Sequence, residues 1–259
     1  MLITSKDNDR IKAIKKLKNK KYRKNKFIVE GIKMVHEAIT ENADIDVIVI
    51  RSDFGDTSQI SKKDLEKYNY IEVTENVFND LTDVVAPQGI LAVINKNKNN
   101  SDIDENDNFI IALDGLQDPG NLGTIIRTAD AANLKQIIVS KDTADCYSPK
   151  VIRSTMGAIY RVNIIETENL ADTLLSLKQN GFDVITTELD ATTSIYDVDY
   201  NKKIVIIGNE ANGVSEDIRN ISDKKVKIPM LGKTESLNAS VAAGLMIYEY
   251  VRQIIWLFC

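Results

Sequence analysis

The sequence predicts an α/β protein built from two successive domains. Strand and helix patterns alternate over residues 1–95 and again over 109–259, and the polar stretch 96–108 between them holds one apolar residue, Ile103. Of the 259 residues, 43% are hydrophobic and 27% are charged, which is ordinary for a globular chain. No apolar run reaches the ~18 residues that a membrane helix needs, and the first ten residues lack the apolar core of a secretion signal. We therefore expect a cytoplasmic protein with a linker between two folded domains.

The first predicted domain, residues 1–95, has the alternation of a compact α/β fold. Ile11, Ile14 and Leu17 recur at helical spacing between basic residues, which predicts an amphipathic helix over 9–18 with a cationic outer face. Short apolar runs predict strands over 27–29, 47–50, 70–73 and 90–94. Further helices are expected over 31–40, over 61–68 and directly after Thr74, which can cap the last of them.

The second predicted domain, residues 109–259, has the pattern of a doubly wound, mostly parallel sheet. Six strands are expected over 109–113, 136–140, 161–165, 183–187, 204–207 and 225–228. Helices are expected over 121–132, 149–156, 169–180 and 238–256. Ligands of such sheets bind outside the carboxyl ends of the strands, so the loops after Leu113, Ile207 and Ile228 are the candidates for a site.

Charge is unevenly distributed along the chain. The net charge is −5, yet the first 36 residues hold twelve Lys and Arg against three acidic residues, a net charge of +9. A basic arm on an acidic protein favours a polyanion-binding site. A solvated, lysine-rich helix face would give the same pattern, so charge alone leaves both interpretations open.

The sequence excludes several kinds of chemistry. There is one histidine, His36, and the two cysteines, Cys146 and Cys259, are far apart, so neither a His/Cys metal site nor a disulfide framework is expected. A histidine-dependent nucleophile would have to use His36, which we interpret as a structural residue on a helix face. No G-x-G-x-x-G follows a strand and no P-loop motif occurs. The sequence therefore gives no support to a dinucleotide-binding protein or to a P-loop protein that binds nucleoside triphosphates.

The loop after the first strand of the second domain, and the helix that follows it, contain two candidate site residues, Asn121 and Arg127. Pro119 and Gly120 predict a tight turn into a helix that starts near Asn121. Arg127 stands among apolar residues of this helix, and an arginine in such a place usually has an anionic partner. A structural ion pair and a bound anionic ligand both remain possible partners.

The loops after the fifth and sixth strands carry the other candidates. Gly208 and Gly213 allow the backbone to approach a ligand closely, and Glu210 lies at the carboxyl end of the strand, although a turn with a helix cap fits equally well. Ser236 and Asn238 precede the long last helix, where capping is the simple interpretation.

Taken together and in this order, the three loops resemble the motifs of the SpoU/TrmH family of RNA ribose 2′-O-methyltransferases. The three matching stretches are NLGTIIRTADA (121–131), IVIIGNEANGVS (204–215) and IPMLGKTESLNASVAAG (228–244). In the first domain, FIVEG (27–31) and PQGILA (87–92) resemble the L30e-like substrate-binding domain of the family. The resemblance covers both predicted domains.

The resemblance implies a SPOUT fold with a six-stranded, mostly parallel sheet and a trefoil knot. It also implies a homodimer that binds S-adenosylmethionine without a metal. By position, the cofactor is expected near Gly208, Ile228, Met230, Leu231 and Leu237. The positions that match the family's catalytic residues are Asn121, Arg127, Glu210, Ser236 and Asn238.

These residue types suit methyl transfer to a ribose hydroxyl. A 2′-hydroxyl is a poor nucleophile at neutral pH and must be oriented or deprotonated. Because an arginine stays protonated, Arg127 is expected to position the substrate phosphate and hydroxyl rather than act as a base. Asn121 can orient Arg127 or the ribose, and Ser236 and Asn238 can fix the target nucleotide or the loop.

The resemblance also implies that a chain with this first domain acts on ribosomal RNA, in particular 23S rRNA, rather than on tRNA. The residues expected to contact RNA phosphates are Lys12, Lys15, Lys16, Lys20, Lys21 and Arg23. A tRNA 2′-O-methyltransferase and a non-catalytic RNA-binding or ribosome assembly factor are the alternatives, and cofactor binding separates the second of these from an enzyme. The apolar tail 254–259 is a candidate for the dimer interface.

Overall fold

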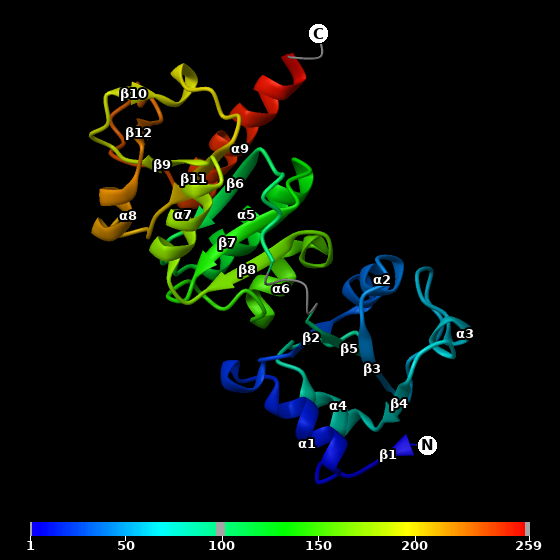
Figure 1. Ribbon diagram of the computed structural model, residues 1–259. Coiled ribbons are helices and arrows are strands. Elements are labelled where there is room, and N and C mark those ends of the chain that lie inside the picture. The colour runs from blue at the N-terminus through cyan, green and yellow to red at the C-terminus, as the bar shows by residue number, and fades with distance from the viewer. Residues whose placement is uncertain (1, 97–101, 257–259) are drawn as a thin grey trace. The chain divides into compact units, whose positions relative to one another are not determined.

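The computed structural model describes residues 2–96 and 102–256 (Figure 1). The chain divides into two compact units, one formed by Met1–Lys98 with Tyr147–Tyr160 and the other by Asn99–Cys146 with Arg161–Cys259. The end of the apolar tail, residues 257–259 including Cys259, lies outside the described residues. Among the described residues, no helix is both long and apolar enough to cross a membrane.

The first unit contains a mixed five-stranded sheet. Its strands, in spatial order, are β1 (Leu2–Ile3), β4 (Tyr70–Val73), β3 (Ile45–Arg51), β5 (Ile90–Asn95) and β2 (Lys26–Glu30). The β1–β4 and β3–β4 pairs are parallel, while β5 runs antiparallel to both β3 and β2. The four predicted strands are confirmed. β1 was missed because a strand of two residues has no periodicity to detect.

Helices cover this sheet because each buries an apolar stripe. They are α1 (Asp9–Lys16), α2 (Ile32–Thr40), α3 (Lys62–Leu65) and α4 (Glu75–Leu81). Apolar side chains of α1 and α4 form one core cluster with β3, β4 and β5, and α2 packs on β2 and β5. The predicted helix over 61–68 is shorter than expected. Thr74 occupies the N-cap position of α4, but its side chain makes no capping hydrogen bond, contrary to the prediction.

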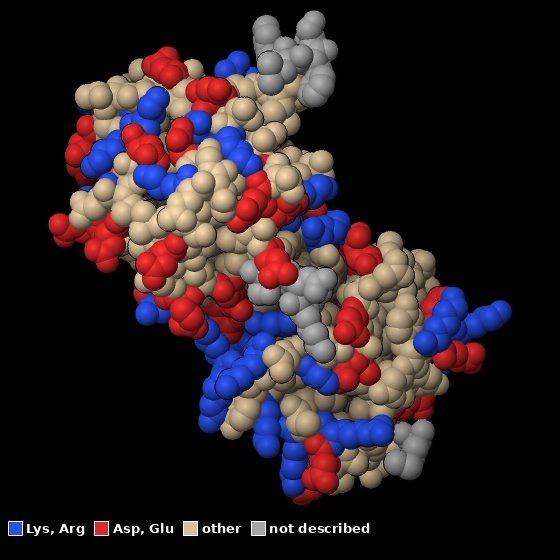
Figure 2. All heavy atoms as spheres, in the orientation of Figure 1, with Lys and Arg blue, Asp and Glu red and all other residues tan. Residues whose placement is uncertain are grey.

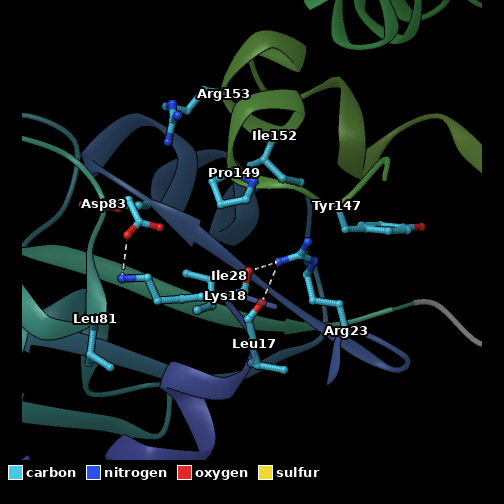
Figure 3. A pocket seen from close by; sticks show the side chains of 11 residues that line it. Leu17, Lys18, Arg23, Ile28, Leu81, Asp83, Tyr147, Pro149, Ile152 and Arg153 are labelled. Atoms are coloured by element: carbon cyan, nitrogen blue, oxygen red, sulfur yellow. Dashed lines mark hydrogen bonds and ion pairs between the residues drawn. The ribbon is translucent and has the colours of Figure 1, made fainter. Parts of the chain in front are cut away.

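The turn after α1 is held by a buried arginine. Nη1 of Arg23 donates to the carbonyl oxygens of Leu17 at 2.8 Å and Lys18 at 2.7 Å, as Figure 3 shows. These carbonyls belong to the end of α1, where helices leave backbone acceptors without partners. Arg23 therefore stabilises the C-terminal end of α1 and the turn that follows it.

One segment of the second predicted domain packs with the first unit. Helix α6 (Pro149–Thr155) lies against β2, the ring of Tyr147 lies 4.8 Å from that of Phe27, and the hydroxyl of Tyr160 donates to the carbonyl of Met34 at 3.0 Å. A cavity of about 30 Å³, room for a water molecule, remains beneath α6 (Figure 3). The sequence reading placed residues 147–160 in the second domain, because a periodicity shows that a helix has an apolar face but not which core receives it.

The second unit contains a seven-stranded sheet in which every pair is parallel. Its strands, in spatial order, are β10 (Thr193–Ser194), β12 (Lys224–Lys227), β9 (Asp183–Thr187), β11 (Lys203–Ile207), β6 (Phe109–Leu113), β7 (Gln136–Ser140) and β8 (Asn163–Thr167). The six predicted strands are confirmed, and β10 is an additional short edge strand. Every residue of β6 and β7 is buried, as expected of strands covered on both faces.

Helices cover both faces of this sheet. They are α5 (Pro119–Ala131), α7 (Leu170–Gln179), α8 (Glu216–Ile221) and α9 (Ala239–Trp256). Apolar residues of α7 and α8 form one core cluster with the sheet, while α5 and α9 pack on each other and on the sheet outside that cluster (Figure 1). The doubly wound α/β prediction is thus confirmed.

The second half of the predicted linker is part of the second unit. Ile103 is half-buried against the core cluster of α7 and α8. The side chain of Gln136 accepts from the N–H of Asp104 at 2.9 Å and donates to its carbonyl at 2.7 Å. The packing of Ile103 could not be predicted from the sequence, because a single apolar residue in a polar stretch gives no periodicity. Residues 97–101 of the predicted linker lie outside the described residues.

The strand register places the loops after β6, β9, β11 and β12 at the same edge of the sheet. Leu113 at the end of β6 pairs with Ile207 at the end of β11, and Thr187 at the end of β9 pairs with Val226 of β12. Four loops therefore leave the sheet at its carboxyl edge, near the point where the strand order reverses between β6 and β11.

Candidate active site

A cavity of about 460 Å³ opens at the carboxyl ends of β9, β11 and β12. This volume lies within the range of ~300–1,000 Å³ typical of small-molecule sites. Its wall combines apolar side chains with polar ones from Thr187–Leu189, Ile207–Ala211, Val226–Ile228 and Ser236–Ala239. Two of the loops predicted from the sequence therefore line one cavity. The segment after β9 was missed, because its place beside β11 and β12 depends on the strand order.

The loop after β11 folds back onto the end of its own strand. The backbone N–H groups of Asn209 and Gly213 each donate to the other residue's carbonyl at 2.9 Å. A Cβ atom on Gly208 would lie 2.2 Å from the carbonyl carbon of Gly213, closer than any real Cβ contact. Only glycine fits at position 208, so this residue sets the shape of the loop.

Two further residues tie this loop to the loop after β6. Nδ2 of Asn209 donates to the carbonyl of Gly115 at 2.8 Å. The N–H of Ser215 donates to Oδ2 of Asp114 at 2.7 Å. Neither Asn209 nor Asp114 was predicted from the sequence. Both lie within two residues of the end of a buried strand, and each stands beside a glycine.

Three predicted catalytic residues form one hydrogen-bonded row. Nδ2 of Asn121 donates to Oε1 of Glu210 at 3.1 Å, and Nδ2 of Asn238 donates to Oδ1 of Asn121 at 2.9 Å. Asn121 is only 9% exposed. Its backbone N–H donates to Oδ1 of Asp118, the N-cap residue of α5, at 2.8 Å. The row joins the start of α5, the loop after β11 and the segment before α9.

Glu210 is held in its ionised form by the same network. Burial alone would raise the pKa of Glu210, but hydrogen bonds from the backbone of Gln117, the side chain of Asn121 and the backbone of Asp118 outweigh it and lower the pKa below the usual value. The N–H groups of Gln117 and Asp118 donate at 2.9 and 3.0 Å. A carboxylate also suits the positive end of the α5 dipole.

This network predicts a pH-dependent stability. Because the folded state lowers the pKa of Glu210, its carboxylate stabilises the fold above the unfolded pKa, and that contribution is lost as pH falls through the folded pKa. Glu210→Gln presents an NH₂ group to donors, so we expect a loss of about 1 kcal/mol at pH 7, moderated by solvent screening, that shrinks below about pH 4. Urea unfolding of both proteins at pH 7 and pH 3.5 measures the difference.

The control for this measurement is Glu235→Gln, because Glu235 is exposed in the loop before α9. We expect it to change stability by less than about 0.5 kcal/mol at either pH. A Glu210→Gln protein as stable as the control at pH 7 would contradict the role of the network.

Most of the other predicted catalytic and cofactor residues line the cavity, and Leu231 does not. Ser236 and Asn238 both line the cavity, and Oδ1 of Asn238 also accepts from the N–H of Ser240 at 2.9 Å near the start of α9. Of the predicted cofactor residues, Gly208, Ile228, Met230 and Leu237 line the cavity. Leu231 does not line it, because its side chain is fully exposed.

Arg127 is exposed on α5 and does not line the cavity. Within the described part of the chain, its guanidinium has neither an ion-pair partner nor a hydrogen-bond partner. The interpretation of Arg127 as a structural ion pair is therefore wrong for the described residues. Its charge is available to a group from outside this chain.

The predicted RNA-contacting residues gather on the first unit, where Figure 2 shows Lys and Arg side chains over α1 and the segment that follows it. The five lysines of the prediction, Lys12, Lys15, Lys16, Lys20 and Lys21, are exposed. Lys15 pairs with Asp80 at 2.7 Å and Lys12 with Asp7 at 3.0 Å. Arg23 differs from them, since it is buried and bound to the end of α1.

No group of three or more His, Cys, Asp or Glu side chains that could hold a metal ion occurs in the part of the chain that the structure describes.

Comparison with known proteins assigns both halves of the chain. Residues 108–248 match the SpoU rRNA Methylase family, and residues 8–92 match the MRM3-like substrate binding domain. The 23S rRNA (guanosine(2553)-2′-O)-methyltransferase RlmP of Bacillus subtilis is 31% identical over 250 residues, which are 95% of this chain and 98% of that protein.

Solved structures are similar over nearly the whole chain. The AdoMet-bound rRNA methyltransferase of Sinorhizobium meliloti has a TM-score of 0.86 and 30% identity over 98% of each chain. The SpoU methyltransferase AviRb of Streptomyces viridochromogenes, in complex with the cofactor AdoMet, has a TM-score of 0.84 and 25% identity over 96% of this chain and 98% of its own.

Proposed function

Since the chain belongs to the SpoU rRNA methylase family, we propose that it transfers the methyl group of S-adenosylmethionine to a ribose 2′-hydroxyl of RNA, with 23S rRNA as its substrate. The observation that carries this proposal is the cavity at the carboxyl ends of the strands, where Glu210, Asn121 and Asn238 form one hydrogen-bonded row. The full-length similarity to a 23S rRNA enzyme supports the choice of RNA.

The cavity fits S-adenosylmethionine in size and lining. Ile228, Met230 and Leu237 offer apolar contacts, and the backbone at Gly208 offers polar groups without a side chain in the way. When bound, the cofactor supplies a methyl group activated by a sulfonium. The protein's task is then to bring a ribose hydroxyl into line with that group.

The residues around the cavity divide this task. The Glu210–Asn121–Asn238 row fixes the start of α5 against the cavity wall, so that Asn121 has one orientation. Arg127, six residues further along α5, keeps its proton and offers several N–H donors to a substrate phosphate or hydroxyl oxygen. Ser236 lines the cavity and can donate to the target nucleotide.

The first unit is the proposed RNA-binding unit. It matches a substrate-binding domain over residues 8–92, and it carries the five exposed lysines of the basic arm. Their proposed role is to contact phosphates and hold the RNA in register, while unpaired bases and the 2′-hydroxyl supply specificity.

We also propose that the protein acts in the cytoplasm as a homodimer whose second unit contains a trefoil knot. A face of α9 exposes apolar side chains at the spacing of one helical stripe, namely Val241, Leu245, Tyr248 and Ile255. Exposed apolar side chains in such a row favour burial against a partner. A second copy is the proposed partner, and Arg127 on the adjoining α5 would then lie close to that interface.

Methyl transfer from labelled S-adenosylmethionine tests the proposed function. The substrates are 23S rRNA, 16S rRNA and bulk tRNA from cells that lack the protein, and modified riboses are mapped as alkali-resistant positions. One resistant position in 23S rRNA is the expected result. Label in tRNA would support a tRNA enzyme, and RNA binding with neither cofactor binding nor transfer would support an assembly factor.

A further inference from the structure

Glu188 is a buried carboxylate in the wall of the cavity to which the proposed chemistry gives no role. It directly follows β9, lines the cavity, and its side chain is only 3% exposed. Its Oε1 accepts from the hydroxyl of Thr186 at 2.9 Å. Burying a carboxylate is costly unless other groups compensate for its charge, so its place at a ligand cavity calls for a physical reason.

Two cations stand beside Glu188, and both are far more exposed than it is. Nζ of Lys225 lies 3.1 Å from Oε2, and Nε of Arg219 lies 3.9 Å from Oε1. The side chain of Lys225 is 50% exposed, so water screens its charge more than it screens that of Glu188. The side chain of Arg219 is 41% exposed, but its Nε is buried and makes no hydrogen bond within the described residues, so it compensates Glu188 only at 3.9 Å. The other charged residues that line the cavity are Glu210 and Lys227.

The ligands of the proposed reaction differ by one unit of charge. S-adenosylmethionine carries a sulfonium that its product, S-adenosylhomocysteine, lacks. A negative charge in the cavity wall, buried from water and only partly offset by its two neighbouring cations, therefore attracts the substrate form more strongly than the product form.

We propose that Glu188 is a specificity residue that makes the cavity favour cationic S-adenosylmethionine over neutral S-adenosylhomocysteine. The inference rests on the proposed function, since it assigns that cofactor to this cavity. Its consequence is that the product, once uncharged, is held less tightly and leaves more readily. Glu188 acts through its charge and needs no direct contact with the ligand.

Three ligands and three variants test the proposal by titration calorimetry. S-adenosylmethionine and sinefungin carry a positive charge near the position of the methyl group, and S-adenosylhomocysteine is neutral there. Glu188→Gln keeps the shape of the side chain and leaves Lys225 and Arg219 without their carboxylate. We expect the preference for the two cationic ligands over S-adenosylhomocysteine to fall by about tenfold, as for a unit charge acting over roughly 10 Å at an effective dielectric constant of about 20.

Lys225→Gln provides a test of opposite sign. Removing this cation should raise the preference for the cationic ligands, by about two- to threefold because Lys225 is half exposed. Asp190→Asn is the matched control, since it removes the same charge two residues away at an exposed position that does not line the cavity. It should leave the ratio of affinities unchanged.

The outcomes separate this proposal from the proposed function. If Glu188→Gln weakens all three ligands by one common factor, the residue is structural and the charge proposal is overturned. An unchanged ratio in Glu188→Gln overturns it as well, whatever Lys225→Gln does. Failure of the unaltered protein to bind any of the three ligands would instead overturn the assignment of the cofactor, and the present inference with it.

Discussion

Arg127→Ala is expected to lower the rate of methyl transfer by about 100-fold or more while S-adenosylmethionine binds within about twofold of the unaltered protein. The guanidinium is exposed, has no partner in the described chain and does not line the cavity. Its loss therefore removes nothing that holds the fold or the cofactor. In the proposed mechanism it removes the donors that position the substrate, and losing one such group typically costs ~10²–10³ in rate.

The measurement is single-turnover transfer to 23S rRNA together with calorimetric titration of the cofactor. Arg127→Lys keeps the charge but not the planar fork of donors, so it should recover only part of the rate. Lys135→Ala, at an exposed position in the same unit, should change neither quantity. An Arg127→Ala enzyme with normal transfer would contradict the catalytic role, and one that loses cofactor affinity would show that the residue belongs to the cofactor site.

Much of the fold follows from local patterns in the sequence. Strands β6, β7 and β11 of the second sheet are nearly continuous apolar runs, and burial on both faces makes such runs easy to recognise. The features that were not predicted have too few residues to show a period. They are β10, the six-residue α8 after Ser215, and the packing of the half-buried Ile103.

The place of α6 shows a different limit. Its apolar residues Val151 and Ile152 predict an inward face, and the structure buries both. The local sequence does not show that the core they enter is that of the first unit. Residues of that unit that contact the segments on either side of α6, Phe27 beside Tyr147 and Met34 beside Tyr160, lie more than a hundred positions away. Long-range packing decides which unit a helix joins.

The candidate site shows the same division. The rule that ligands bind at the carboxyl ends of parallel strands led to the loops that carry Asn121, Glu210 and Asn238. The structure brings these three side chains together, although their hydrogen bonds could not be predicted. Glu188 was missed because its place depends on the order of β9, β11 and β12. Arg23 was expected at the RNA because it is basic, whereas its geometry makes it a cap for the end of α1.

Gly208→Ala is expected to abolish measurable cofactor binding, a loss of more than about 100-fold, and to lower the melting temperature. The new Cβ would lie 2.2 Å from the carbonyl carbon of Gly213 and 2.3 Å from the nitrogen of Val214. Both are backbone atoms, so no side chain can turn aside to make room. The loop after β11 must move, which we expect to cost about 2 kcal/mol, or roughly 4–8 °C in a protein of this size.

That movement should affect the site more than the fold. Opening the loop breaks the paired hydrogen bonds of Asn209 with Gly213 and shifts Glu210 away from Asn121, so the cavity wall and the polar row are lost together. Gly232→Ala is the matched control, because a Cβ there has no atom within 4 Å. Calorimetric titration and thermal unfolding of both variants measure the two effects. A Gly208→Ala protein that melts and binds like Gly232→Ala would show that the close approach of the two backbone segments is not needed, and the cofactor cavity would then have to be formed by the loops after β9 and β12 alone.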